Sequence, residues 1–382
     1  MFQTLSFVVR ANVFLFWIGI LFFESGCSKS VSVLPEVNPP TDTTTTGEPT
    51  PLKPSLQLTL DTTFASDSDE IFATTARFGS KELYSWEEIK VEEGIYGQAV
   101  DYLGRKISLQ YKFMAPANDT LSHRPFIMMI HEGAFLFGDK ENETNKVRSL
   151  AMRGYAVATI NYRVGYDGGS QVNPCGGQYK GAAEAIYRAV QDSYTALHYF
   201  MDRRQILGID TSQVFLAGSS AGAITLSALA YTTESDFEKI QPGLFSSLGP
   251  LDPWQVGRRI KIRGLLTSLG YGLPVPHQLR RTNARPIIFF QKAEDTVLPN
   301  YSGPLFGCKG FPELMGSELL VTELKKYAQS YELNIESGTG HLLNFPDQYI
   351  AEKYAVFIKK IWQKDLQQSR YLDYNMIENN KL

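Results

Sequence analysis

One serine of the chain stands in a setting that could make it a nucleophile. It is Ser220, the middle residue of the motif GSSAG at 218–222, which follows the apolar run VFLA at 214–217 and precedes the small, helix-compatible run AITLSALA. Glycines at both ends of the motif permit a sharp strand-to-helix turn, which pushes the middle serine into the open at a helix N-terminus. We therefore expect Ser220 to be reactive and its neighbour Ser219 to pack locally.

A reactive serine hydroxyl needs a base that accepts its proton, and the base needs a partner that orients it. Asp295 follows the apolar run IIFF at 287–290 and precedes a Val-x-Pro turn, and His341 ends the loop GTGH at 338–341. We expect Asp295 to orient His341 and His341 to act as the base. Glu294, one residue before Asp295, would point elsewhere and is expected to be solvated.

The other four histidines have less suitable settings. His198 lies inside a long helical pattern, whereas His123 and His277 lie near prolines in loops, so surface or packing roles are expected for all three. His131 begins the motif HEGAF, where its ring is expected to hold the loop backbone rather than to transfer protons. The fourth residue after His131 is phenylalanine, so the His-Glu-x-x-His pattern of zinc proteases is absent.

Alternating strands and helices are predicted to position these side chains. Short, nearly continuous apolar runs predict strands that are buried on both faces, as in parallel sheets; they lie at 125–130, 155–160, 214–217, 262–266 and 287–290. Residues 182–203 repeat apolar side chains at spacings of three and four, which predicts a helix, and a strand near 333–335 precedes a final helix at about 346–362. Segments 83–91 and 98–114 mix apolar and polar residues, which predicts antiparallel edge strands.

This alternation predicts an α/β fold with a mostly parallel central sheet and helices on both faces. In such sheets the ligand lies beyond the carboxyl ends of the strands, where the loops with the serine, aspartate and histidine are expected. We predict one catalytic domain at 61–365, with an insertion at about 232–259 that is long enough to form part of a lid, and a polar C-terminal tail at 366–382.

Composition excludes several classes of function. The chain has 382 residues, of which 43% are hydrophobic and 20% charged, and its formal net charge is only −3. A broad basic face for nucleic acid is therefore not expected. Three cysteines and five histidines fall into no Cys-x-x-Cys or His-x-x-x-His spacing, so neither a metal site nor a disulfide scaffold is expected.

The N-terminus has the pattern of an export signal. Arg10 precedes an apolar run at 11–23, which is shorter than the roughly 20 residues that cross a bilayer. Small residues then precede Cys27, an arrangement that resembles a bacterial lipoprotein cleavage site, although Glu24 departs from it. Lipidation of Cys27, ordinary cleavage and an uncleaved anchor all export the protein, as a cell-envelope lipoprotein or otherwise as a secreted protein. Residues 28–60, rich in Thr and Pro, are predicted to be a disordered tether.

Taken together, the motifs resemble those of the α/β-hydrolase superfamily, and within it the carboxylesterase and hormone-sensitive-lipase-like serine esterases. The resemblance runs from about residue 98 to 362 and includes HEGAF, GSSAG, EDTVLP and GTGH in the family's order. It implies hydrolysis of a carboxylic ester through an acyl-enzyme, with no cofactor. It also implies that the backbone N–H groups of Gly133, Ala134 and Ala221 form the oxyanion hole. Glu132 replaces a glycine of the family pattern, and it either points to solvent or lines the mouth of the site.

Several alternatives stay open at this point. A serine peptidase of the same fold usually brings a propeller, for which the chain has no room, and an exported binding or adhesion module would commonly lack a triad residue. Cys175 and Cys308 lie in loops and could form a disulfide in an oxidising compartment or stay as free thiols. The substrate is expected to be a small-molecule or glycan-linked ester. A glycan acetate, a hydroxycinnamate, a lipid and a xenobiotic all fit, and oligomeric state is left open.

Overall fold

The computed structural model describes residues 67–119 and 121–382. The predicted export signal, Cys27 and the tether at 28–60 lie outside the described residues. The described residues belong to one compact unit, which extends to Leu382. No helix among the described residues has both the length and the apolar character that a membrane span requires.

A ten-stranded sheet forms the centre of this unit, in the order β1-β2-β4-β3-β5-β6-β8-β11-β12-β13. Strands β4, β3, β5, β6, β8, β11 and β12 are mutually parallel, and β1, β2 and β13 are antiparallel to their neighbours. The bounds are β1 Ile89–Val100, β2 Lys106–Pro116, β3 Arg124–Ile130, β4 Ala156–Ile160, β5 Ile209–Ser219, β6 Ile262–Ser268, β8 Ile287–Asp295, β11 Tyr331–Gly340, β12 Gln367–Leu372 and β13 Asn375–Lys381. Three short strands, β7 Leu273–Pro274, β9 Ser302–Pro304 and β10 Glu313–Met315, form a second sheet.

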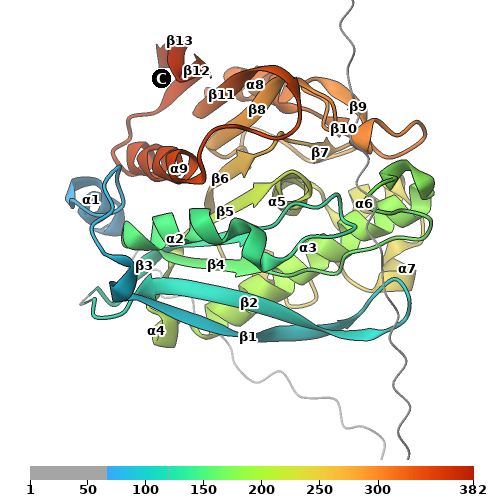
Figure 1. Ribbon diagram of the computed structural model, residues 1–382, viewed down its shortest axis with the longest axis horizontal. Coiled ribbons are helices and arrows are strands. Elements are labelled where there is room, and N and C mark those ends of the chain that lie inside the picture. Colours follow the sequence, from blue (N-terminus) through green and yellow to red (C-terminus); the bar gives the residue numbers. More distant parts are fainter. Residues whose placement is uncertain (1–66, 120) are drawn as a thin grey trace, which may run out of the picture. The chain divides into compact units, whose positions relative to one another are not determined.

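Helices cover both faces of the large sheet (Figure 1). Helices α1, α2 and α9 pack on one face, whereas α3, α5 and α8 pack on the other. The helix bounds are α1 Asp67–Thr74, α2 Thr144–Met152, α3 Tyr179–Asp202, α4 Arg204–Leu207, α5 Ala221–Tyr231, α6 Glu234–Ile240, α7 Leu244–Leu248, α8 Ser317–Lys326 and α9 Asp347–Trp362. The predicted α/β fold with a mostly parallel sheet between two helical layers is therefore confirmed.

Strand β3 illustrates why the central strands read as unbroken apolar runs. Its alternate residues face opposite sides of the sheet, so Phe126 and Met128 join the core under α3 and α5, and Ile127 and Met129 join the core under α2 and α9. All four are fully buried. A strand covered on both faces gains burial from every side chain, which favours apolar residues at successive positions.

The order of the strands fixes where loops can meet. After β3 the chain moves to β4 on one side, and after β4 it crosses to β5 on the other side of β3. The carboxyl ends of β3 and β5 therefore flank a point at which the direction of winding reverses, which is where open α/β sheets bind ligands. The HEGAF motif follows β3, and the GSSAG motif spans the end of β5 and the start of α5.

Two sequence predictions of elements were wrong. Residues 366–382 are not a tail, because most of them form β12 and β13 and extend the sheet beyond β11. Their polar sequence does not predict strands, because the edge of a sheet is stabilised mainly by backbone hydrogen bonds and polar side chains are common there. Residues 83–91 form a strand only from Ile89, because Ser85 and Glu88 make a capping box around a short 3-10 helix at Trp86–Glu88.

Candidate active site

Ser220 lies at the turn from β5 into α5, in a backbone conformation that side chains seldom adopt. Its φ and ψ are 50° and −113°. A Cβ atom at Gly222 would lie 2.1 Å from the carbonyl oxygen of Ile130, and one at Gly218 would lie 2.6 Å from the Gly222 backbone. Both glycines are therefore required for a turn this tight, which packs directly against the end of β3.

The three side chains predicted to cooperate form one hydrogen-bonded series. His341 Nε2 lies 2.9 Å from Ser220 Oγ, and His341 Nδ1 lies 3.0 Å from each carboxylate oxygen of Asp295. Ser220 follows β5, Asp295 ends β8 and His341 follows β11, so the carboxyl ends of three parallel strands supply the three groups. With the imidazole proton on Nδ1, Nε2 is free to accept the proton of the serine hydroxyl.

The side chain of Asp295 is held in place by the turn that follows it. Its side chain is fully buried, and Oδ1 accepts hydrogen bonds from the backbone N–H groups of Val297 and Leu298 at 2.8 and 2.9 Å. These N–H groups fix which oxygen faces the turn and aim the carboxylate at His341. Glu294 instead lies at the surface and accepts a hydrogen bond from Thr339, so the two adjacent acids point in different directions.

The loop after β3, which contains Gly133 and Ala134, begins next to the turn at Ser220, since a Cβ atom at Gly222 would lie 2.9 Å from the His131 carbonyl oxygen. The φ angles of Gly133 and Ala134 are 118° and 53°, and a Cβ atom at Gly133 would lie 2.1 Å from the Phe137 carbonyl oxygen. Within the described part of the chain, the backbone N–H groups of Gly133 and Ala134 have no hydrogen-bond acceptor. Ala221 is the first residue of α5, and the N–H groups of a first helical turn have no partner inside the helix.

His131 and Glu132, the first two residues of this loop, make contacts that hold its backbone in place. His131 Nδ1 donates to the Glu132 carbonyl oxygen at 2.6 Å, and the ring stacks on Tyr162 with centroids 4.3 Å apart. Burial lowers the pKa of His131, so its ring is neutral near pH 7. The Glu132 carboxylate does not point freely to solvent, because Asn142 donates to it at 2.7 Å. The sequence did not identify Asn142 or the buried Glu143 beside it as part of this site. The one indication of a buried acid was the spacing of three residues between Glu143 and Lys146.

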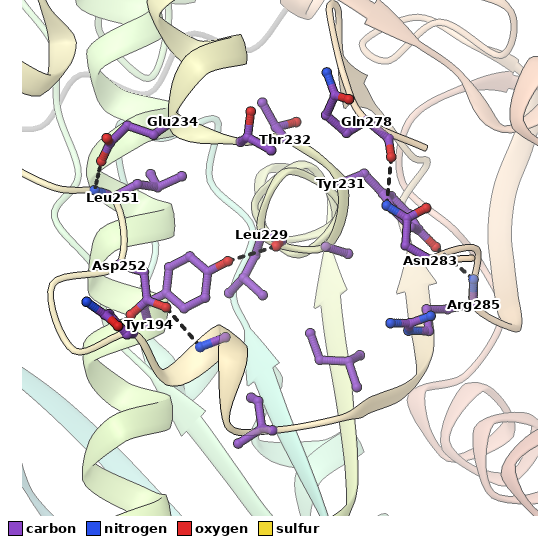
Figure 2. Close-up of a pocket in the computed structure, with 16 residues that line it drawn as sticks. Tyr194, Leu229, Tyr231, Thr232, Glu234, Leu251, Asp252, Gln278, Asn283 and Arg285 are labelled. Atoms are coloured by element: carbon purple, nitrogen blue, oxygen red, sulfur yellow. Dashed lines mark hydrogen bonds between the residues drawn. The ribbon is translucent and has the colours of Figure 1, made fainter. Parts of the chain in front are cut away.

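The segment predicted as a lid lies away from the serine. Its first residues follow the C-terminal end of α5, whereas Ser220 precedes the N-terminal end, and the 11 residues of α5 span roughly 16 Å. The segment packs along α3, where Trp254 stacks on His198 with centroids 4.4 Å apart and Leu251 is buried in the core. It borders a polar cavity of about 530 Å³, and Figure 2 shows Tyr194 and Arg285 at its walls.

A disulfide between Cys175 and Cys308 joins two loops at the carboxyl end of the sheet. Their Cα atoms are 5.2 Å apart, and the two residues are separated by 133 positions in sequence. The second loop also carries Phe306, whose ring lies 6.2 Å from that of Phe135 in the HEGAF motif. Within the described ranges, no group of three or more His, Cys, Asp or Glu side chains is arranged to hold a metal ion.

Comparisons with known proteins find similarity to esterases. The BD-FAE family model matches residues 111–247, from within β2 to within α7. Juvenile hormone esterase of Heliothis virescens is 25% identical over 219 residues, which are 53% of this chain and 37% of that protein. The chain therefore spans little more than a third of that relative's length.

Among solved structures, propionate-bound esterase 2 of Thermogutta terrifontis has a TM-score of 0.48 at 14% identity, covering 73% of this chain and 95% of its own. MGS-M1, an α/β hydrolase from a Medee basin deep-sea metagenome library, has a TM-score of 0.43 at 16% identity, covering 72% and 99%. Over residues 111–247 the chain is therefore similar to the BD-FAE family, and its relative among curated proteins is an esterase.

Proposed function

We propose that this protein hydrolyses carboxylic esters through an acyl-enzyme on Ser220. The observation that carries the proposal is the unbroken series of hydrogen bonds from Ser220 Oγ through the His341 imidazole to Asp295. An esterase needs a nucleophile, a base within hydrogen-bonding reach and a group that orients the base, and this series has the geometry for all three roles.

In the proposed reaction, Ser220 Oγ bonds to the carbonyl carbon of the ester while its proton passes to His341 Nε2. The negative charge that develops on the carbonyl oxygen is stabilised by the N–H groups of Gly133, Ala134 and Ala221. His341 then returns the proton to the departing alcohol oxygen. Water attacks the acyl-serine by the same route, with His341 as base, and releases the acid and the free serine. Asp295 keeps the imidazole oriented and stabilises its charged form throughout.

The class of substrate is proposed at a coarse level, as a small-molecule or glycan-linked ester. Support comes from the BD-FAE match and from the relative named juvenile hormone esterase, in addition to the site geometry. A panel of p-nitrophenyl acetate, butyrate and octanoate, followed by glycan acetates and hydroxycinnamate esters, would rank acyl groups by kcat/KM.

The decisive experiment compares the wild type with Ser220→Ala on this panel. The variant should lose at least about a thousandfold in kcat, because it lacks the hydroxyl that contacts His341 Nε2. Ser219→Ala is a matched control, since Ser219 is buried and its hydroxyl contacts Ser268 at 2.8 Å. Equal rates for wild type and Ser220→Ala would refute the proposed function.

We further propose that the protein is exported and lipidated at Cys27. The apolar run at 11–23 and the small residues before Cys27 support this, as does the Cys175–Cys308 disulfide, because disulfides persist in oxidising compartments. Cys27→Ser should abolish incorporation of a labelled fatty acid in bacterial cells. Unchanged labelling of the variant would contradict lipidation.

A further inference from the structure

The hairpin of β12 and β13 extends the central sheet beyond β11 (Figure 1). Its two-residue turn, Asp373 and Tyr374, lies beside the point at which β11 stops pairing with β12, because the Asp373 N–H donates to the Ile335 carbonyl oxygen at 3.0 Å. Residues 336–345 continue from this point, contain His341 and are called the histidine loop. The hairpin turn therefore lies next to the segment that carries the proposed base.

The histidine loop has little regular pairing of its own. Its register with β8 shifts between Glu336 and Thr339, so the two residues between them have no partner in that ladder. Gly338 and Gly340 have φ angles of 89° and 120°, in the left-handed region that glycine adopts at little cost. Contacts from other elements must therefore hold the loop if the imidazole is to stay 2.9 Å from the serine hydroxyl.

The hairpin turn holds the start of the histidine loop through Asp373. Its Oδ1 accepts a hydrogen bond from the Ser337 N–H at 2.8 Å. Hydrogen bonding to Ser337 lowers the pKa of Asp373, so the side chain is a carboxylate near pH 7. A hydrogen bond to an ionised acceptor is stronger than one between neutral groups. The Glu336 carboxylate closes the loop as well, because both of its oxygens accept from the Asn344 N–H at 3.1 and 2.9 Å.

The same turn holds the end of the histidine loop through the ring of Tyr374. This ring meets that of Phe345 at an interplanar angle of 90°, with centroids 4.9 Å apart, and lies equally close to the ring of Tyr349 on α9. Phe345 is buried, and its ring also packs on Phe290 of β8 with centroids 5.6 Å apart. Edge-to-face contacts of this kind stabilise aromatic pairs beyond the area that they bury. The last residue of the loop is thus fixed between the core and the hairpin turn.

The backbone of the turn does not explain why a tyrosine is present. The φ angles of Asp373 and Tyr374 are 46° and 72°. Two-residue hairpin turns with two positive φ angles favour Asn-Gly, Asp-Gly or Gly-Gly, and a bulky side chain with positive φ is an outlier. Glycine at position 374 would therefore form the turn with less strain. The contacts of the Tyr374 ring with Phe345 and Tyr349 account for a side chain that the turn itself disfavours.

We propose that Asp373 and Tyr374 are positioning residues for His341, because they hold the two ends of the histidine loop from the turn of the C-terminal hairpin. This inference rests on the proposed esterase function. The two residues act through the loop, which keeps His341 Nε2 within reach of the Ser220 hydroxyl. A small displacement of a catalytic group is enough to lower kcat. Since the base acts in the transition state, loosening the loop should lower kcat and kcat/KM together and change KM little.

The test measures kcat and KM for p-nitrophenyl butyrate, at a temperature at which urea unfolding shows each variant to be folded. Asp373→Gly/Tyr374→Gly keeps a dipeptide that favours this hairpin turn and removes both contacts with the histidine loop. Its kcat should fall about tenfold, with KM nearly unchanged. Asp373→Asn/Tyr374→Phe keeps the acceptor oxygen and the ring, so it should retain the kcat of wild type. Met376→Ala, at an exposed position of β13, is the matched control and should also follow wild type.

A second measurement follows the histidine loop without catalysis, by amide hydrogen exchange and mass spectrometry. Peptides that cover 336–345 should exchange several-fold faster in Asp373→Gly/Tyr374→Gly than in wild type, because the Ser337 N–H loses its acceptor, whereas peptides from β5 should be unchanged. The inference is overturned if this variant keeps the kcat of wild type, if KM changes instead of kcat, or if exchange at 336–345 is unchanged. An equal loss of kcat in Asp373→Asn/Tyr374→Phe would also overturn it. Full activity of Ser220→Ala would instead refute the esterase proposal, and the exchange result would stand apart from it.

Discussion

Replacing Asp295 by asparagine tests how the carboxylate controls the imidazole. The substitution keeps the shape of the side chain and removes its charge. In the structure the backbone N–H groups of Val297 and Leu298 both point at Oδ1, so the amide oxygen of asparagine should take that place. The amide NH₂ would then occupy the Oδ2 position, 3.0 Å from His341 Nδ1.

This placement turns the histidine into the wrong tautomer. An NH₂ group facing Nδ1 favours the form in which Nδ1 accepts and Nε2 carries the proton. Nε2 would then donate toward Ser220 Oγ, 2.9 Å away, and could not accept its proton. An equivalent change in a serine protease lowers kcat by about 10⁴, which corresponds to about 5 kcal/mol of activation free energy. We expect a loss of about 10³ to 10⁴ here, because Oδ1 remains near Nδ1 as an alternative acceptor.

The assay is kcat for p-nitrophenyl butyrate, with urea unfolding to verify that stability is retained. Glu294→Gln is the matched control, since this neighbouring acid lies at the surface and contacts Thr339 rather than His341. It should stay within about twofold of wild type. The reasoning fails if Asp295→Asn retains more than about a tenth of wild-type kcat, or if Glu294→Gln loses as much activity as Asp295→Asn.

Three further outcomes are expected. His198→Ala should leave ester turnover within about threefold of wild type, because this ring stacks on Trp254 rather than contacting Ser220. If kinetic assays showed a loss of several orders of magnitude, the assignment of His341 as the base would be contradicted. Gly222→Ala should destabilise the fold by about 3 kcal/mol or more in urea unfolding, since its Cβ would meet a carbonyl oxygen at 2.1 Å, whereas Gly79→Ala, with no atom within 4 Å, should be nearly neutral. Equal effects of the two glycine changes would argue against the tight turn. Joint replacement of Cys175 and Cys308 by serine should lower the free energy of unfolding by about 2–5 kcal/mol, and an unchanged denaturation midpoint would show that the disulfide does not stabilise the fold.

The central strands were predictable because each is an apolar run closed by a motif. Residues 125–130 and 287–290 correspond to β3 and β8, and the structure extends β8 into Asp295. The sequence also indicated which loops would meet, because parallel strands present their carboxyl ends at one edge. The structure places Ser220, Asp295 and His341 within hydrogen-bonding distance there, and their catalytic roles stay predictions until kinetics are measured.

The failures share a different physical origin. The strand β12 has buried Gln367, Gln368 and Ser369, and no hydrophobic pattern marks a strand whose stability comes from backbone pairing and polar contacts. The buried Glu143 could not be predicted for a similar reason. Glu143 lies in a polar stretch that is typical of solvated charges, and its burial depends on the tertiary packing around it.

The contact between Gly222 and the end of β3 means that the turn at Ser220 and the HEGAF loop are held by the same pair of central strands. Ile130, whose carbonyl oxygen abuts Gly222, pairs with Gly218 in the parallel ladder of β3 and β5 and is followed at once by the HEGAF loop. Motion of the outer helices should therefore move the Ser220 turn and the HEGAF loop together and change the distance between them little. Surrounding segments could then move to admit substrate while the distance between the Ser220 turn and the HEGAF loop stays nearly constant.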